Sequence, residues 1–127
     1  MNKDELKKSN PELYHVAFEK GTEAPFSGSL LKETGQGTYN CAVCGNPLFK
    51  SDAKFHSEMP GLAGWPSFDE SIPGSVNFVP DDSHGMQRTE VICSKCKAHL
   101  GHIFDDPEAK TGKHYCMNSV CLDLKKD

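Results

Sequence analysis

The sequence lacks any long apolar run, any cluster of basic residues and any heptad repeat. Its first residues are mostly polar or charged, and they lead into no apolar segment of the kind that a signal peptide or a membrane span requires. The net charge is −4 over 127 residues, so no basic stripe is present to neutralise phosphates. We therefore expect a cytoplasmic protein that contacts neither membranes nor nucleic acid.

Helical periodicity is confined to one stretch near the N-terminus. Asn10 suits the N-cap, Pro11 suits the first helical position, and Gly21 can end the helix. The apolar stripe of this helix, at i, i+3 and i+4, would consist of Leu13, Val16 and Ala17. We expect residues 1–10 to form a flexible N-terminal segment and residues 11–127 to form a single domain.

Eleven Gly and eight Pro residues divide the rest of the chain into short segments. Such punctuation is typical of short strands joined by turns rather than of a helical bundle. The strand candidates are residues 37–42, 75–79, 87–93, 101–104 and 113–124. In the last of these, Val120, Leu122 and Leu124 alternate with Cys121 and Asp123. The sequence predicts a mainly β fold with a short N-terminal helix.

Four of the six cysteines form two C-x-x-C pairs, Cys41/Cys44 and Cys93/Cys96. Four thiolates at this spacing predict a tetrahedral Zn²⁺ site, since the fold can bring the two distant pairs together. Disulfides are the alternative, but an oxidising compartment is not indicated. Two redox C-x-x-C sites would need a βαβ context. Four cysteines close the coordination sphere, so we expect one structural zinc ion rather than a catalytic one.

The remaining cysteines, Cys116 and Cys121, are left for other chemistry. Asn118 lies two residues beyond Cys116 and shares its face on a regular strand. His99 and His102 follow the second cysteine pair, and an imidazole can help to ionise a thiol and shuttle its proton. The alternatives are that Cys116 is an inert core cysteine and that His99 only supports the metal site.

The only Trp lies in a Pro/Gly-rich loop, Pro60-Gly61-Leu62-Ala63-Gly64-Trp65-Pro66-Ser67-Phe68. A large aromatic held between Gly and Pro can be structural filling or one wall of a substrate pocket.

An ordered series of motifs resembles the B-type methionine sulfoxide reductases over residues 11–124. The blocks are Tyr14-His15-Val16, Glu19 to Phe26, Cys41-Ala-Val-Cys44-Gly45, Pro47-Leu48-Phe49, Gly64-Trp65-Pro66-Ser67-Phe68, Ser83 to Val91, Cys93-Ser-Lys-Cys96, His99-Leu-Gly-His102-Ile-Phe104, Thr111-Gly112 and Tyr115-Cys116-Met117-Asn118-Ser119. Each block alone is a weak signal, but their order is specific.

The resemblance implies two antiparallel sheets, a peripheral zinc ion and reduction of methionine-R-sulfoxide, free or in proteins. Cys116 would attack the sulfoxide sulfur and become a sulfenic acid. The resemblance implies that His102 and Asn118 lie beside this nucleophile. It assigns the substrate region to Trp65, Phe68, His99, Asp106 and His114. The implied partner is thioredoxin or a similar thiol reductant, and a monomer is expected.

The chain departs from the family pattern at three places. Ala63 stands where many members carry the cysteine that resolves the sulfenic acid, and the loop 56–62 before it is longer than usual. His114 replaces the usual Arg, which would make activity more dependent on pH. Asp106-Pro107-Glu108 replaces the usual Asp-Gly-Pro.

Without the usual resolving cysteine, two routes remain for reducing Cys116. Cys121 would point to the opposite face of a regular strand, because five residues separate it from Cys116. We therefore favour direct reduction by an external thiol over an internal Cys116–Cys121 disulfide. The alternative from another class is a zinc-stapled β-fold module that binds proteins and has no catalysis.

Overall fold

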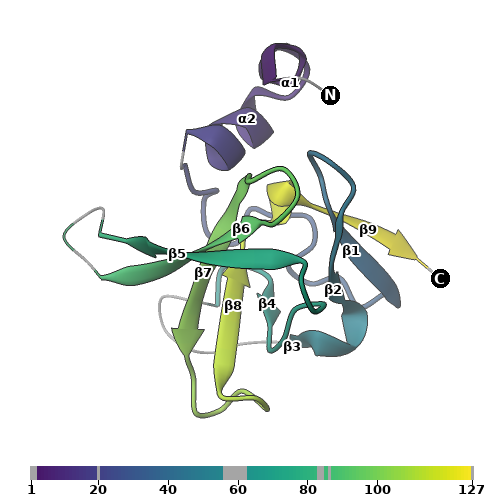
Figure 1. The fold of residues 1–127 in the computed structure, drawn as a ribbon. Coiled ribbons are helices and arrows are strands. Elements are labelled where there is room, and N and C mark those ends of the chain that lie inside the picture. The colour runs from purple at the N-terminus through teal and green to yellow at the C-terminus, as the bar shows by residue number, and fades with distance from the viewer. Residues whose placement is uncertain (1–2, 20, 56–62, 83–84, 86, 127) are drawn as a thin grey trace.

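The computed structural model describes residues 3–19, 21–55, 63–82, 85 and 87–126 (Figure 1). Within them the chain is mainly β, with two antiparallel sheets and two short helices. This confirms the expected fold class. The loop 56–62 and residues 83 and 84 lie outside the described residues.

One sheet has three strands in the order β2-β1-β9. These strands are β1 (Gly37–Cys41), β2 (Pro47–Lys50) and β9 (Leu122–Lys126). The other sheet has six strands in the order β3-β4-β8-β7-β6-β5. Its strands are β3 (Lys54–Phe55), β4 (Ser67–Phe68), β5 (Val76–Asp81), β6 (Arg88–Cys93), β7 (His99–Asp105) and β8 (Lys113–Met117). A 3₁₀ turn, η1 (Ser51–Ala53), joins β2 to β3.

The strand predicted over residues 113–124 is wrong in one respect, because it is two strands in different sheets. The short 3₁₀ turn η3 (Ser119–Cys121) separates β8 from β9. The break starts at Asn118, whose backbone N–H donates to Leu100 and whose carbonyl accepts from Cys121. The predicted alternation holds from Leu122 onward, but Cys121 is buried.

The predicted helix is present as α2 (Pro11–Phe18), and its predicted apolar stripe is buried. Asn10 caps it, since the Asn10 side chain accepts from the N–H of Leu13 at 3.2 Å. The helix ends at Phe18, earlier than expected. A second helix, α1 (Lys3–Ser9), occupies the segment expected to be flexible. It holds one buried residue, Leu6, and a single apolar anchor produces no periodicity to find.

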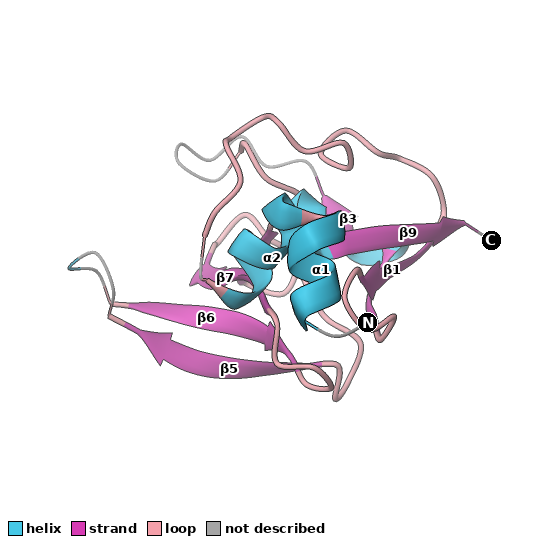
Figure 2. Cartoon of the chain, turned by 90° about the horizontal axis from the view of Figure 1, so that it is seen from above, coloured by secondary structure: helices cyan, strands magenta, loops and turns pink. Residues whose placement is uncertain are grey.

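Seen from above in Figure 2, the two helices lie over the middle of the molecule, between the β5–β6 hairpin and β9. No helix in the described part of the chain combines the length and the apolar character that crossing a membrane demands.

Aromatic rings from both sheets form the centre of the core. Phe49 on β2 stacks on Phe68 on β4 with ring centroids 4.3 Å apart, and Tyr39 on β1 meets Phe68 edge-on at 5.1 Å. All three residues are fully buried. Burial of one such side chain stabilises the fold by about 1.5–3 kcal/mol, so these rings fix how the sheets pack.

Candidate active site and metal centre

The four paired cysteines meet at one point between the two sheets. Their sulfur atoms all lie within 4.8 Å of one another. Cys41 and Cys44 belong to the turn between β1 and β2 in the smaller sheet, and Cys93 and Cys96 belong to the turn between β6 and β7 in the larger. A metal ion held by these residues would link the two sheets.

The two turns have the same backbone hydrogen bonds. The N–H of Gly45 donates to the carbonyl of Cys41 at 2.8 Å, and the N–H of Lys97 donates to Cys93 at 2.9 Å. Gly45 and Lys97 both have positive φ, 83° and 65°. Left-handed backbone suits Gly but strains a residue with a Cβ.

The spacing of the sulfur atoms fits a tetrahedral metal site. Zinc binds thiolate at about 2.3 Å, and a tetrahedron of that size has edges of about 3.8 Å. The Cys41–Cys96 and Cys44–Cys93 sulfur separations are 3.7 and 3.6 Å. Four cysteines therefore form a site that could hold one metal ion, consistent with zinc.

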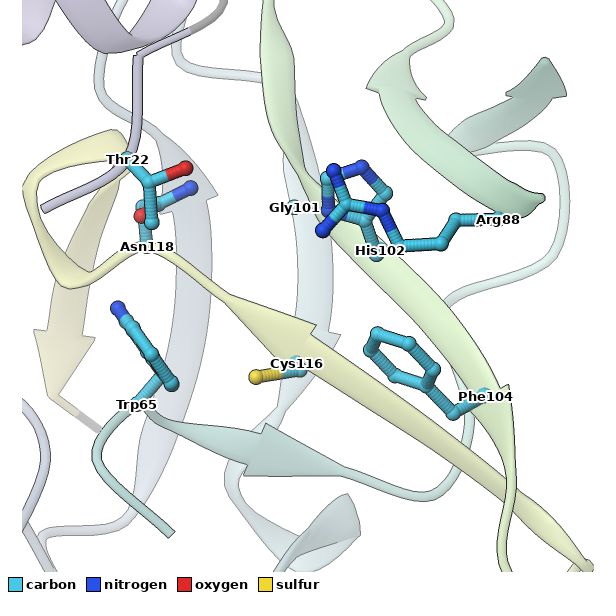
Figure 3. Close-up of a pocket in the computed structure, with 8 residues that line it drawn as sticks. All are labelled: Thr22, Trp65, Arg88, Gly101, His102, Phe104, Cys116 and Asn118. Atoms are coloured by element: carbon cyan, nitrogen blue, oxygen red, sulfur yellow. The ribbon is translucent and has the colours of Figure 1, made fainter. Parts of the chain in front are cut away.

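Cys116 lies outside this cluster, in the middle of the six-stranded sheet. It is half-buried on β8 and pairs with His102 on β7 and with Ser67 on β4. Its side chain opens into a cavity of about 100 Å³ lined by Thr22, Trp65, Arg88, Gly101, His102, Phe104, Cys116 and Asn118. In Figure 3 the sulfur of Cys116 is directed toward Trp65, with His102, Arg88 and Phe104 on the other side of the cavity. The structure thus brings together four of the residues singled out from the sequence: Trp65, His102, Cys116 and Asn118.

The segment 22–26, between α2 and β1, holds two walls of this cavity in place. The indole N–H of Trp65 donates to the carbonyl of Glu23 at 3.0 Å. The N–H of Glu23 donates to the side-chain oxygen of Asn118, also at 3.0 Å. The Glu23 carboxylate accepts the N–H of Val120 at 2.9 Å, and burial raises the pKa of Glu23. One residue therefore fixes Trp65, Asn118 and the turn that follows β8.

His102 is held from behind by a carboxylate on β5. Its Nε2 lies 2.7 Å from Asp81, and the same Asp81 oxygen lies 3.5 Å from the guanidinium of Arg88. Asp81 is buried, so it shares its charge with both groups in a site where water competes poorly. This arrangement sets the orientation of the imidazole in the cavity wall.

Four other predicted site residues lie in the interior and do not line the cavity. Phe68 is fully buried under Phe49, so direct contact with a substrate is not open to it. His99 pairs with Glu90 at 2.5 Å, and burial lowers the pKa of His99. The ring of His99 meets that of His102 edge-on at 5.2 Å, so it packs behind the cavity wall.

His114 and Asp106 form the remaining buried pair. The Nδ1 of His114 lies 3.0 Å from Asp106, and its Nε2 lies 2.8 Å from the hydroxyl of Ser67. The hydrogen bond from His114 lowers the pKa of Asp106. Since Ser67 is on β4 and His114 on β8, the pair joins the strand that follows Trp65 to the strand that carries Cys116.

The environment of Cys116 favours the neutral thiol in the resting site. Burial is the main cause and the charge of Glu23 the second, and together they raise its pKa to about 12. The sequence suggested that an imidazole would assist ionisation, yet His102 turns one ring nitrogen to Asp81. A proton must therefore leave the sulfur as it reacts.

Cys121 does not line the cavity. It is almost completely buried within η3, and its thiol donates to the carbonyl of His99 at 3.4 Å. The six cysteines are all described and form no disulfide.

Six residues that build the site were not singled out from the sequence. These are Thr22, Glu23, Asp81, Arg88, Gly101 and Phe104. All except Asp81 fall inside the quoted motif blocks, so position within a block was the available signal. Asp81 gave none, because the pairing of β5 with β6 brings it to Arg88 and the pairing of β6 with β7 brings His102 near both.

The arrangement combines one half-buried thiol, an aromatic wall, an oriented imidazole and an amide in a cavity open to solvent. A nucleophile with a nearby general acid–base group can cleave a weak bond in a small neutral substrate. The metal cluster contributes no side chain to this cavity.

Comparison with known proteins gives a consistent result. Residues 9–126 match the SelR domain. A peptide methionine sulfoxide reductase MsrB of Leptospira interrogans is 46% identical over 127 residues, covering 99% of this chain and 94% of that protein. Proteins of the same description from Methanosarcina barkeri and Pseudomonas fluorescens are 51% and 53% identical, covering 92% and 91% of this chain and 80% and 86% of their own lengths.

Proposed function

The chain belongs to the B-type methionine sulfoxide reductases, and from this premise we propose that Cys116 takes the oxygen of methionine-R-sulfoxide and becomes a sulfenic acid. The enzyme is a peptide-methionine (R)-S-oxide reductase. The observation that carries the role of Cys116 is its position: it is the only cysteine that lines the cavity beside Trp65 and His102.

The proposed step balances as an oxygen transfer. The sulfur of Cys116 attacks the sulfoxide sulfur. The S–O bond of the sulfoxide breaks, and a new S–O bond forms on Cys116. The sulfoxide sulfur gains two electrons and the cysteine sulfur loses two. The thiol proton ends on the transferred oxygen, so the products are methionine and the sulfenic acid of Cys116.

We assign the proton transfer to His102 and the steering of the oxygen to Asn118. Asp81 holds His102, which leaves its second ring nitrogen to accept the thiol proton and return it to oxygen. The Asn118 amide nitrogen donates one hydrogen to the carbonyl of Leu100 at 3.0 Å and has a second to offer. The high pKa of Cys116 requires that this transfer accompany the attack.

Trp65 would receive the methyl group of the sulfoxide. Its ring is fixed by the bond to Glu23, and a rigid aromatic face selects an S–CH₃ group by shape and dispersion. The interior residues Phe68, His99, Asp106 and His114 would act by holding the strands in register rather than by touching substrate.

We propose that an external thiol, such as thioredoxin, reduces the sulfenic acid. Ala63 cannot form a disulfide, and Cys121 is enclosed in η3, away from the cavity. Reduction consumes two thiols and yields a disulfide of the reductant and one water. The metal would be a single structural zinc ion, since four cysteines leave no coordination position open. We further propose that the protein works in the cytoplasm as a monomer.

The test is reduction of defined R and S diastereomers of methionine sulfoxide with dithiothreitol. We expect turnover of the R form only. Cys116→Ser should reduce turnover at least about 1,000-fold, since the nucleophile is lost. Cys121→Ser is the matched control and should retain turnover with an external thiol. Activity in Cys116→Ser, or none in the parent protein, would contradict the proposal, and the latter is what a protein-binding module would show.

A further inference from the structure

Phe26 is the most exposed large apolar side chain in the described residues. It is 69% exposed, and the next, Phe78 on β5, is 51% exposed. A single exposed apolar residue needs no explanation by itself. Phe26 differs because its backbone is strained and because it is attached to the wall of the reactive cavity.

The backbone of Phe26 is in the left-handed region, with φ of 63°. This conformation costs a bulky residue roughly 1–2 kcal/mol and persists only when surrounding contacts enforce it. The N–H of Phe26 donates to the carbonyl of Gly64 at 2.8 Å. Gly64 also packs so closely on Pro25 that a Cβ at Gly64 would lie 2.6 Å from the Pro25 side chain. These contacts hold the aromatic ring outside the core.

The same segment continues into the cavity. Thr22 lines it, and the carbonyl of Glu23 holds the Trp65 indole. The backbone of Phe26 is bonded to Gly64, the residue before Trp65, so Phe26 lies beside the loop that carries the Trp65 wall.

The size of the cavity determines which part of a substrate must lie outside it. About 100 Å³ is smaller than the roughly 150 Å³ cavity that admits one benzene molecule, so it accommodates the methyl and sulfinyl end of a side chain. The backbone of the substrate and its neighbouring residues therefore remain outside.

We propose that Phe26 is a docking residue for oxidised polypeptides, contacting an apolar side chain next to the methionine sulfoxide in the substrate chain. This inference rests on the proposed function. An aromatic ring on an ordered backbone offers apolar contact at a modest entropic cost, because only the side chain remains to be ordered. The enzyme should therefore prefer sulfoxides flanked by apolar residues to the same group flanked by Gly.

The test compares kcat/KM, with dithiothreitol as reductant, for two pairs of substrates. The first pair is acetyl-Phe-methionine-R-sulfoxide amide and acetyl-Gly-methionine-R-sulfoxide amide. In the second pair, Phe or Gly follows the methionine sulfoxide instead of preceding it. In the parent protein we expect the Phe substrate of at least one pair to be favoured about 2- to 12-fold, the range of one aromatic contact. In Phe26→Ala this ratio should fall to about one. Phe26→Gly should give the same ratio and relieves the backbone strain, so it keeps the test valid if Phe26→Ala folds poorly. Phe78→Ala removes the other exposed ring and should keep the parent ratio.

A parent ratio of one, or a ratio unchanged in both Phe26 variants, would overturn the inference while leaving the proposed function intact. A defect seen only when thioredoxin replaces dithiothreitol would overturn it too, since Phe26 would then contact the reductant. Failure of the parent protein to reduce any sulfoxide would instead overturn the proposed function.

Discussion

The two cysteine sites of this molecule use the same atom for opposite purposes. At the metal centre, four sulfur atoms come from two hairpin turns and face one another. At the reactive site, one sulfur from β8 faces a cavity whose walls come from separate parts of the chain. The difference shows that neighbouring groups determine what a thiol does. Thiols surrounded by other thiolates form a structural metal site, whereas a thiol that faces a cavity beside an aromatic ring and an imidazole can act as a nucleophile.

The largest effect is expected from removing one cysteine of the metal site. Cys41→Ser removes one ligand from a site that joins the two sheets, and structural zinc contributes about 10–16 kcal/mol of folding free energy in small zinc peptides. We expect loss of the bound metal together with unfolding or a strongly lowered melting temperature. Metal content and thermal unfolding followed by circular dichroism measure both.

The matched variant for this comparison is Cys116→Ser, which changes a sulfur of the other site. It should keep its metal and melt close to the parent temperature while losing activity. A Cys41→Ser protein that is folded, metal-free and fully active would remove the distinction between the two sites.

The next largest effect is expected in the rate at which Cys116 is alkylated. With a pKa of about 12, Cys116 is almost entirely a neutral thiol at pH 7.5, whereas an ordinary cysteine is about one-tenth ionised. We expect iodoacetamide to alkylate it on the order of a thousandfold more slowly than an unperturbed thiol. The rate should rise about tenfold per pH unit from pH 7 to 10 without reaching a plateau. Mass spectrometry of the modified peptide assigns the rate to Cys116.

The raised pKa of Cys116 also predicts how the stability of the fold depends on pH. The folded protein keeps the Cys116 proton that the unfolded chain releases above pH 8.5, so this group's contribution to stability falls as pH rises from there toward 12. Cys116→Ser should lessen that alkaline loss. A plateau in alkylation near or below pH 8.5 would show that a neighbour stabilises the thiolate, and the proton transfer assigned to His102 would lose its basis.

The metal centre was predictable from the sequence because its signal is local. Each C-x-x-C pair is formed by a single turn, and only the meeting of the pairs depends on the fold. The α2 stripe was predictable for the same reason. β3 and β4 were missed because two-residue strands have no periodicity.

The reactive site could be assigned only in part, because its support comes from distant strands. Resemblance pointed to Trp65, His102 and Asn118, which do line the cavity with Cys116. It also placed Phe68 and His114 near substrate, whereas the structure puts both in the interior. Pairing of β5 with β6 brings Asp81 beside Arg88, and pairing of β4 with β8 brings Ser67 beside Cys116. Sequence spacing does not contain these contacts between distant strands.

The smallest effect concerns the two turns of the metal centre, which differ at one equivalent position. Gly45 and Lys97 share the same hydrogen bond and the same left-handed backbone, but only Lys97 carries a Cβ there. Lys97→Gly should therefore be more stable than Lys97→Ala by about 0.5–1 kcal/mol, and Gly45→Ala should be less stable than the parent by a similar amount. The comparison with Lys97→Ala is needed because both variants lose the bond from the Lys97 amine to the carbonyl of Ser94. Urea unfolding of the metal-loaded proteins measures each difference. Equal stability of Lys97→Gly and Lys97→Ala would mean that the four thiolates, and not the backbone of the turn, determine this geometry.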